Sequence, residues 1–346
     1  MITLANDTFL RAARGLRTER TPIWMMRQAG RVLPEYRAVR EKHSFLDVAR
    51  IPELCAEVTA QPVERLDVDA AILFSDILLP FTAMGIGVDF LPGPVLERAY
   101  DPRAGLGQLR LPDPTLDWAF LADCVRATNE RLAGRVPLIG FAGAPFTLAT
   151  YLVEGGSSKS YERTRAWMFT DPDGFLAFLL FLADRVAEWL QVQVDAGVRA
   201  FQLFDSWAGT LAREEMETFA LPAASRVFRA VRAPEAMPRI YFAPGAGASW
   251  EAQAHCGCNV LGLDWRTSLA AVRAKRPRLA LQGNLDPGVL LGSPATIRRK
   301  VEAILAEAGE AGHVFNLGHG ILPQTPLENA EYVVRIVHEL SEDQGA

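Results

Sequence analysis

Residues 69–76 read DAAILFSD, a run of five apolar residues closed by a serine and an aspartate. A continuous apolar run of this kind is typical of a parallel β-strand that is covered on both faces. Seven similar runs occur along the chain: PIWMM at 22–26, VPLIGFAG at 136–143, AFQLFDS at 200–206, RIYFAPG at 239–245, NVLGLDW at 259–265, LALQGNLD at 279–286 and HVFNLGHG at 313–320. The sequence therefore predicts eight buried strands.

Helical patterns fill the spaces between these runs. Residues 171–195, 293–309 and 327–340 carry apolar side chains at helical spacing. Strand and helix alternating in this way favour a (β/α)8 TIM barrel, with a doubly wound sheet as the alternative. No linker or repeat divides the chain, so residues 1–346 are expected to form one domain, with a Pro- and Gly-rich excursion at 80–117.

Charge and hydropathy narrow the class of protein. The 346 residues carry a net charge of −5, which argues against general nucleic-acid binding, and 49% are hydrophobic, which argues against bulk disorder. The most apolar run, at 175–183, is far shorter than the roughly 20 residues that cross a bilayer, so no membrane partner is expected. Residues 1–50 hold ten Arg or Lys against five Asp or Glu, which indicates either a local anionic ligand or a solvated helix face.

The four cysteines, Cys55, Cys124, Cys256 and Cys258, are expected to be free thiols. No apolar run precedes the first arginines, so we expect a cytoplasmic protein in a reducing compartment. The segment HCGC at 255–258 is similar to a metal-binding sequence, but it lacks the second pair of ligands that zinc sites use. We therefore interpret these cysteines as packed side chains and expect no metal.

Polar side chains follow several predicted strands, at the end where (β/α)8 barrels carry their active sites. Arg27 and Arg31 stand four residues apart after the first strand, and they share a face if the turn enters a helix. Arginine suits bidentate binding of carboxylate or phosphate, and the alternative is a surface pair. Asp76 ends the most apolar strand, where a carboxylate is costly unless it caps a helix, bonds an arginine or takes part in catalysis.

Two further segments carry candidate residues. His319 lies between two glycines, which let a ligand approach the backbone closely, although a turn histidine is the simpler interpretation. Tyr151 precedes EGGS at 154–157, a loop that could close over a ligand. The dinucleotide-binding, phosphate-loop and nucleophile-elbow motifs are absent from the sequence.

Two long segments carry a resemblance to a known family. PIWMMRQAGR at 22–31 resembles the N-terminal signature of the uroporphyrinogen decarboxylase family, and GFAGAPFTLATYLVEGG at 140–156 resembles its second signature. Shorter segments match the family in order: FSDIL at 74–78, LFDS at 203–206, GLDW at 262–265, QGNLD at 282–286 and NLGHG at 316–320. The resemblance covers residues 5–340.

This resemblance implies a single (β/α)8 barrel, a homodimer and no cofactor. The implied reaction converts uroporphyrinogen III to coproporphyrinogen III by removing CO2 from four acetate side chains. By the family pattern Asp76 and Arg27 are catalytic, and the residues that bind substrate are Arg27, Gln28, Ala29, Gly30, Arg31, Arg40, Asp76, Tyr151, Phe204, Ser206 and His319. The eight carboxylates of this substrate would give the basic segment 1–50 its ligand.

The implied chemistry requires stabilisation of positive charge. Protonation of a pyrrole ring supplies the electron sink for decarboxylation, and the Asp76 carboxylate would accept pyrrole N–H groups and stabilise the cation. CO2 then leaves, and a second protonation forms the methyl group. An arginine-bound acetate or Arg27 itself is the proton source, and the sequence does not choose between them.

Two other functions stay open on the sequence. One is a corrinoid- or zinc-dependent methyltransferase of the same superfamily, whose ligands would have to come from His255, Cys256 and Cys258. The other is a tetrapyrrole-binding protein without turnover. The chain also departs from the family pattern at FAPG, residues 242–245, where relatives often carry lysine or another polar residue, and at Ser206, where some carry threonine.

Overall fold

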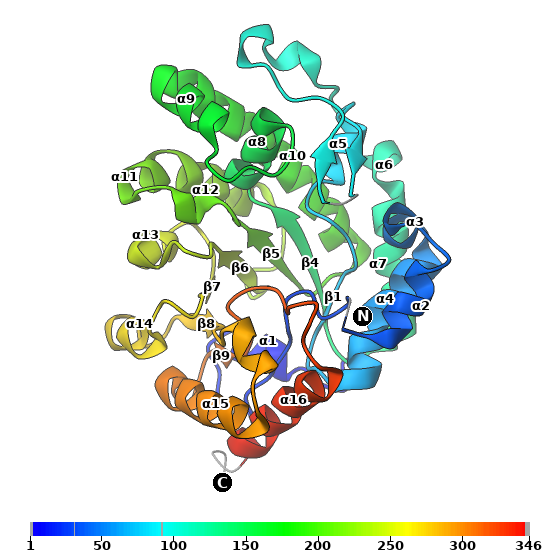
Figure 1. Ribbon diagram of the computed structural model, residues 1–346, viewed down its shortest axis with the longest axis vertical. Helices are drawn as coiled ribbons and strands as arrows, with labels where there is room; N and C mark the ends of the chain where they lie inside the picture. The colour runs from blue at the N-terminus through cyan, green and yellow to red at the C-terminus, as the bar shows by residue number, and fades with distance from the viewer. Residues whose placement is uncertain (1–2, 31, 91–92, 343–346) are drawn as a thin grey trace.

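The predicted strands assemble into one parallel sheet at the centre of the molecule (Figure 1). A computed structural model of the chain describes residues 3–30, 32–90 and 93–342. Over these residues the main sheet has seven strands, each hydrogen-bonded to the next in chain order. They are β1 (Ala71–Ile72), β4 (Leu138–Gly143), β5 (Ala200–Phe204), β6 (Arg239–Phe242), β7 (Val260–Gly262), β8 (Ala280–Gln282) and β9 (His313–Val314).

The segment at 22–26 closes this sheet into a ring between β9 and β1. Ile23 forms a parallel bridge with Phe315, and the backbone N–H of Asp69 donates to the carbonyl of Ile23 at 2.8 Å. The eight predicted runs therefore all lie in the ring, although residues 22–26 pair through single contacts rather than as a regular strand. The prediction of a (β/α)8 barrel is confirmed.

α-Helices cover the outside of the ring (Figure 1). The helices predicted at 171–195, 293–309 and 327–340 are confirmed as α10, α15 and α16. Within the described ranges, none of the helices is both long enough and apolar enough to cross a membrane. The bounds are α1 Thr8–Ala12, α2 Pro34–Arg40, α3 Phe45–Arg50, α4 Pro52–Leu66, α5 Pro80–Ala83, α6 Pro114–Asp117, α7 Ala119–Leu132, α8 Pro145–Glu154, α9 Glu162–Thr170, α10 Pro172–Ala196, α11 Arg213–Glu215, α12 Leu221–Ala230, α13 Trp250–Gln253, α14 Leu269–Lys275, α15 Pro294–Ala308 and α16 Leu327–Glu342.

The excursion after β1 contains α5 and a small antiparallel hairpin, β2 (Val88–Asp89) with β3 (Val95–Leu96). Backbone hydrogen bonds fasten it to α8: Tyr100 donates to Leu152 at 2.8 Å, and Leu96 donates to Gly155 at 3.1 Å. The excursion therefore buttresses the helix that carries Tyr151.

Side chains along the strands alternate between the barrel interior and the layer under the helices. On β6, Ile240 and Phe242 belong to the interior cluster, which also contains Trp24 and Val314. Tyr241, between them, packs in the layer between sheet and helices. This is the two-residue period of a β-strand, and it decides which residues can reach the ends of the barrel.

A short chain of hydrogen bonds links three polar side chains inside the barrel, although Nε2 of Gln202 has no partner among the described residues. The indole N–H of Trp24 donates to Gln282 Oε1 at 3.0 Å, and Gln282 Nε2 donates to Gln202 Oε1 at 2.9 Å. All three side chains are fully buried, where an unpaired amide would be costly. The chain of bonds connects segment 22–26 to β8 and β5 across the interior.

At the N-terminal end of the barrel, a buried carboxylate stabilises the fold. Asp69, which precedes β1, accepts hydrogen bonds from Asn6, Arg20, the Ile23 backbone and His338 at 2.8 to 2.9 Å. Burial by itself would raise the pKa of Asp69, but the His338 and Ile23 hydrogen bonds and the charge of Arg20 hold it below its usual value. A fully partnered carboxylate here secures the fold, because active sites of such barrels lie at the opposite end.

Candidate active site

Arg27 lies in a tight turn directly after segment 22–26. Its backbone has a φ of +64°, a region that non-glycine residues seldom adopt. Gly30 closes the turn, because a Cβ at this position would lie 2.8 Å from the carbonyl oxygen of Arg27. The turn leaves Arg27 exposed, and its guanidinium forms no hydrogen bond or ion pair with any other described residue. It is available for an anion.

Gln28 and Ala29 face inward from the same turn. The buried side chain of Gln28 accepts from the Met25 N–H at 2.9 Å and donates to the Ala70 carbonyl at 3.0 Å. Its amide therefore fastens the turn to the start of β1, and contact with a ligand is left to its backbone. Ala29 packs on the core. Arg31, predicted to bind substrate, lies outside the described residues.

Asp76 follows β1 at the active-site end. It is half-buried, and Oδ1 accepts the N–H of Leu78 at 2.8 Å, which caps the turn that follows. Burial raises the pKa of Asp76 to about 6, against the lowering effects of this hydrogen bond and of the Arg27 charge. Unlike Asp69 at the other end of β1, Asp76 forms no ion pair with the described residues. Its carboxylate is poised to interact with a positively charged ligand group.

Tyr151 projects from α8 towards the same place. It is 8% exposed, and its ring centroid lies 5.8 Å from that of Trp207. Burial and the negative charge of Asp76 raise the pKa of the phenol, while Arg27 lowers it. Tyr151 therefore stays protonated near neutral pH and can donate a hydrogen bond. The fold brings together Arg27, Asp76 and Tyr151, which are far apart in sequence.

Phe204 ends β5, Ser206 follows it in the next turn, and both are half-buried. The Phe204 ring packs edge-on against Phe141 and Phe242, with centroid distances of 5.5 and 6.2 Å. Asp205, between them, is fully buried and points to the opposite side, into the layer under the helices. Phe204 and Ser206 therefore point to the other side, the barrel interior, at the active-site end.

Asp205 holds this region together, and the sequence does not single it out. Its two carboxylate oxygens accept hydrogen bonds from Thr147 and Tyr241 hydroxyls, each at 2.7 Å. Thr147 in turn accepts the N–H of Trp207 at 3.1 Å, and Trp207 packs against Tyr151. Burial raises the pKa of Asp205 to about 6, although these hydroxyl bonds lower it. In the sequence, Asp205 could have been identified from its position next to Ser206 in the family segment LFDS.

His319 occupies the turn after β9. Its Nδ1 accepts the N–H of Gly320 at 2.7 Å, so the proton of the neutral ring resides on Nε2. Protein around the ring lowers the pKa of His319, as do the positive charges of Arg27 and Arg266, against the raising effect of Asp264. The residue is nevertheless exposed, so Nε2 can donate to a ligand.

Arg40 is placed differently from the other predicted residues. It ends α2 and donates to the carbonyl of His43 in the loop that follows. None of its described contacts reaches Asp76 or Arg27. Its predicted role in substrate binding therefore stays a prediction.

The HCGC segment does not assemble a metal site among the described residues. His255 Nδ1 interacts with the carbonyl of Glu251 at 2.7 Å, and Nε2 lies 3.0 Å from Arg276, so both ring nitrogens are engaged away from the cysteines. Burial and the contact with Cys258 raise the pKa of Cys256. The residues present do not fit the zinc set that the methyltransferase alternative needs.

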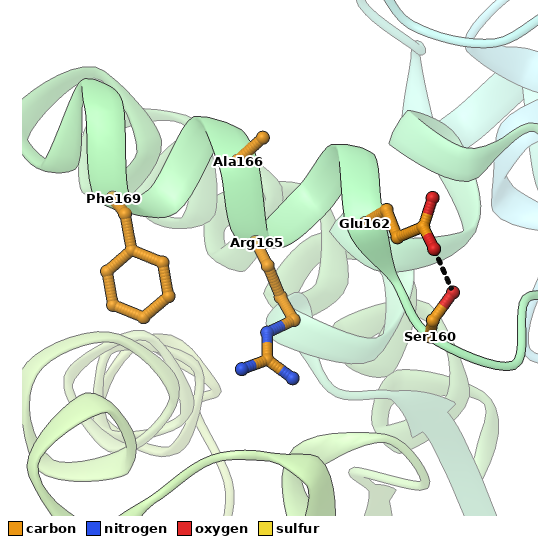
Figure 2. A pocket seen from close by; sticks show the side chains of 5 residues that line it. All are labelled: Ser160, Glu162, Arg165, Ala166 and Phe169. Atoms are coloured by element: carbon orange, nitrogen blue, oxygen red, sulfur yellow. Dashed lines mark hydrogen bonds between the residues drawn. The ribbon is translucent and has the colours of Figure 1, made fainter.

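A separate hollow lies on the outer surface of α9. Its volume is about 450 Å³. Figure 2 shows the side chains that line it on α9 and on the loop before this helix, with the hydrogen bond between Ser160 and Glu162, 3.0 Å long, marked as a dashed line. It shares no residue with the predicted site. Its lining residues are Ser160, Glu162, Arg165, Ala166 and Phe169.

The fold and the residues at the active-site end define the class of protein. It is a (β/α)8-barrel protein with cationic and acid–base side chains at the carboxyl ends of its strands. The family model described as "Uroporphyrinogen decarboxylase (URO-D)" matches residues 4–340. A uroporphyrinogen decarboxylase of Trichlorobacter lovleyi is 46% identical over 97% of this chain and 99% of its own length. One from Alkalilimnicola ehrlichii is 47% identical over 99% and 96%. The chain belongs to the uroporphyrinogen decarboxylase family.

Solved structures agree on the fold. A methyltransferase from Methanosarcina mazei superposes with a TM-score of 0.79 at 18% identity, covering 98% of this chain and 99% of its own. A B12-independent methionine synthase from a Shewanella species gives 0.54 at 9% identity, covering 82% and 87%. At these identities the similarity concerns the fold alone, whereas the relatives of higher identity bear the decarboxylase name.

Proposed function

We propose that this protein decarboxylates the four acetate side chains of uroporphyrinogen III, giving coproporphyrinogen III and four CO2. The observation that carries the proposal is the arrangement of Asp76, a half-buried carboxylate without an ion pair among the described residues, beside Arg27 and Tyr151. An anionic substrate that becomes locally cationic during reaction needs both kinds of charge in one place.

Asp76 acts on the charge that develops in the ring. Protonation of a pyrrole carbon makes a cation, and the Asp76 carboxylate stabilises it while accepting pyrrole N–H groups. The bond between the acetate methylene and its carboxylate then breaks, CO2 leaves, and the electron pair enters the ring. A proton adds to the methylene to give a methyl group and the ring proton is lost, so each acetate consumes one proton overall.

Arg27 and the other polar groups hold the substrate. The guanidinium of Arg27, which has no hydrogen bond or ion pair within the described part of the chain, pairs with a carboxylate in bidentate geometry. Arg31 is assigned the same role from its position in the family signature. Tyr151 and His319 offer hydroxyl and Nε2–H donors, Ser206 offers a hydroxyl, and the Phe204 ring supplies an apolar surface for a pyrrole.

Conversion of the substrate tests this function directly. Purified protein is incubated with uroporphyrinogen without oxygen, and the products are separated by their number of carboxylates. We expect eight-carboxylate substrate to give four-carboxylate product, with four CO2 per molecule. Unchanged substrate would remove the assignment, and substrate retained on the protein without CO2 release would favour a tetrapyrrole-binding protein.

The quaternary structure belongs to the same proposal. The family resemblance supports a homodimer of single-domain chains that works in the cytoplasm without a cofactor. Sedimentation equilibrium at micromolar concentration should give twice the mass of one chain, and a single cooperative unfolding transition should accompany it. A monomer at that concentration would exclude the dimer while leaving the reaction untouched.

A further inference from the structure

Asp264 joins three of the loops that surround the candidate active site. Its Oδ2 accepts the N–H of Gly245, after β6, at 2.8 Å. The same oxygen accepts Nη1 of Arg266 at 2.7 Å, and Oδ1 accepts the Arg266 backbone N–H at 3.1 Å. Asn284, after β8, donates to the Asp264 carbonyl at 3.0 Å. The loops after β6, β7 and β8 are thus fixed to one buried residue.

The loop after β9 packs directly on the same point. A Cβ at Gly318 would lie 2.7 Å from the backbone nitrogen and 2.8 Å from Cε3 of Trp265. On the other side of His319, a Cβ at Gly320 would lie 2.5 Å from Cδ of Arg27. The Gly-His-Gly turn is therefore enclosed by Arg27 on one side and by the segment of Trp265 and Arg266 on the other.

Arg266 is held in a fixed orientation but remains open to ligand. Its guanidinium carbon lies 4.2 Å from the ring centroid of Trp265, a stacking contact, and one nitrogen is held by Asp264. The side chain is still 59% exposed, and Nε and Nη2 form no hydrogen bond with the described residues. A stacked guanidinium with an open edge is preorganised to accept a carboxylate in two parallel bonds.

The charge of Arg266 reaches the candidate site. Together with burial and Arg27, it lowers the pKa of His319, so two guanidiniums act on this imidazole. Asp264 compensates part of the charge, but its carboxylate is buried behind the guanidinium and is shared with the Gly245 N–H. The exposed edge of this part of the site is therefore positive.

We propose that Arg266 is a substrate-binding residue that holds one peripheral carboxylate arm of the tetrapyrrole, on the far side of His319 from Arg27. This inference rests on the proposed function. A substrate with eight carboxylates needs several cations around it, and of the arginines named from the sequence Arg40 is engaged with His43. The family segment GLDW ends at Trp265, so it does not include Arg266.

Arg266→Gln tests the proposal, with Arg266→Lys as its conservative partner. We expect Gln to raise KM for uroporphyrinogen about tenfold with kcat within about twofold of wild type, because a charge-assisted bond outside the reacting centre contributes to binding alone. Lys keeps a cation for Asp264 but loses the planar fork, so it should recover only part of KM. Thermal unfolding of both variants separates lost binding from a disturbed loop.

Arg335→Gln is the matched control. Arg335 also lies over an aromatic ring, with 5.3 Å to the Tyr332 centroid, and also pairs with a carboxylate, Glu339, but it stands on the outer helix α16. We expect its KM to match wild type. Equal KM for Arg266→Gln and Arg335→Gln, or a KM defect of Arg266→Gln that only accompanies a large fall in melting temperature, would overturn the proposal.

Inhibition by the four-carboxylate product shows whether Arg266 binds an acetate or a propionate side chain. The product keeps the four propionates and has lost the acetates. If Arg266 binds a propionate, the inhibition constant of the product should rise in parallel with KM in Arg266→Gln. An unchanged inhibition constant with a raised KM identifies an acetate, and either result supports carboxylate binding. If the wild-type protein does not convert uroporphyrinogen, both the proposed function and this inference are wrong. If wild type is active and Arg266→Gln has the wild-type KM, only the inference is wrong.

Discussion

The aliphatic part of the Arg27 side chain passes directly over Gly320, so that a Cβ on this glycine would lie 2.5 Å from Cδ and 2.9 Å from Cγ of Arg27. Arg27 belongs to the turn between segment 22–26 and α2, and Gly320 belongs to the loop after β9. Closure of the ring brings these two ends of the barrel sequence together (Figure 1). The absence of a side chain at Gly320 therefore allows the Arg27 guanidinium to occupy its observed position.

We expect Gly320→Ala to displace Arg27 and leave the fold intact. The clash is with a flexible, exposed side chain, so the backbone need not move, but the guanidinium loses its place beside His319 and Asp76. Activity at low substrate concentration should fall about tenfold, in the range of one lost charge-assisted bond. Gly107→Ala is the control, because a Cβ there meets nothing within 4 Å. Equal activity of the two variants would show that the position of Arg27 is not critical.

Asp76→Asn should lose about 10²–10³ in kcat, because the amide keeps hydrogen-bonding capacity but not the charge that stabilises a cationic ring. With a pKa of about 6, wild-type Asp76 becomes protonated as pH falls through that value, so its activity should decline there. Near-normal turnover of Asp76→Asn across the pH range would show that the residue only caps the turn at Leu78.

The same variant has a predictable effect on stability. The folded-state pKa of Asp76, about 6, lies above the ordinary value of 3.8, so folding favours the protonated form. The stability contributed by that form is complete below the unfolded pKa and is lost as pH rises through the folded one. The free energy of unfolding of Asp76→Asn, relative to wild type, should therefore increase between about pH 4 and about pH 7. Denaturant titrations at both pH values measure it.

Tyr241→Phe should destabilise the protein by about 1–3 kcal/mol, because one oxygen of the fully buried Asp205 carboxylate loses its donor. The Tyr241 bond lowers the pKa of Asp205, so its removal should raise that pKa above about 6 and make the loss greater in alkaline than in acidic buffer. Tyr332→Phe, at a half-buried position on α16, should cost little by comparison. A pH-independent loss would mean that the hydroxyl contributes through packing alone.

Treatment with a metal chelator should leave turnover unchanged. The electron sink is supplied by the substrate ring, and His255 is engaged with Glu251 and Arg276 instead of with Cys256 and Cys258. Elemental analysis before and after chelation provides the check. One zinc per chain whose removal abolishes activity would favour the methyltransferase alternative.

Strand order and the barrel itself were predictable from the sequence, because continuous apolar runs are what a doubly covered parallel sheet requires. The irregularity of residues 22–26 was not. There the backbone N–H groups of Ile23 and Met25 are bound by the side chains of Asp69 and Gln28 in place of a regular ladder. The sequence places Gln28 with the arginines that flank it, and only the folded turn shows its amide pointing inward.

The candidate site divides in the same way. Arg27, Asp76, Tyr151 and His319 could be named because each follows a recognisable strand or lies in a long family segment. The parts played by Asp205 and Asp264 could not, because each depends on a donor from a different strand or loop, the Tyr241 hydroxyl and the Gly245 N–H respectively. Such partners are set by the closure of the barrel, which no local pattern encodes.

The two nitrogens of His319 can be tested separately with paired amide variants. Asparagine can present an oxygen near the position of Nδ1 and keep the bond from the Gly320 N–H, while losing the Nε2 donor. Glutamine can present an N–H near the position of Nε2. If substrate binds through Nε2–H, His319→Gln should retain more of wild-type kcat/KM than His319→Asn, by about tenfold, the value of one hydrogen bond to a charged group. A higher kcat/KM for His319→Asn than for His319→Gln would indicate that His319 shapes the turn through Nδ1. Any loss of activity in Gly320→Ala would then be due to Arg27 and not to a hydrogen bond from His319 Nε2.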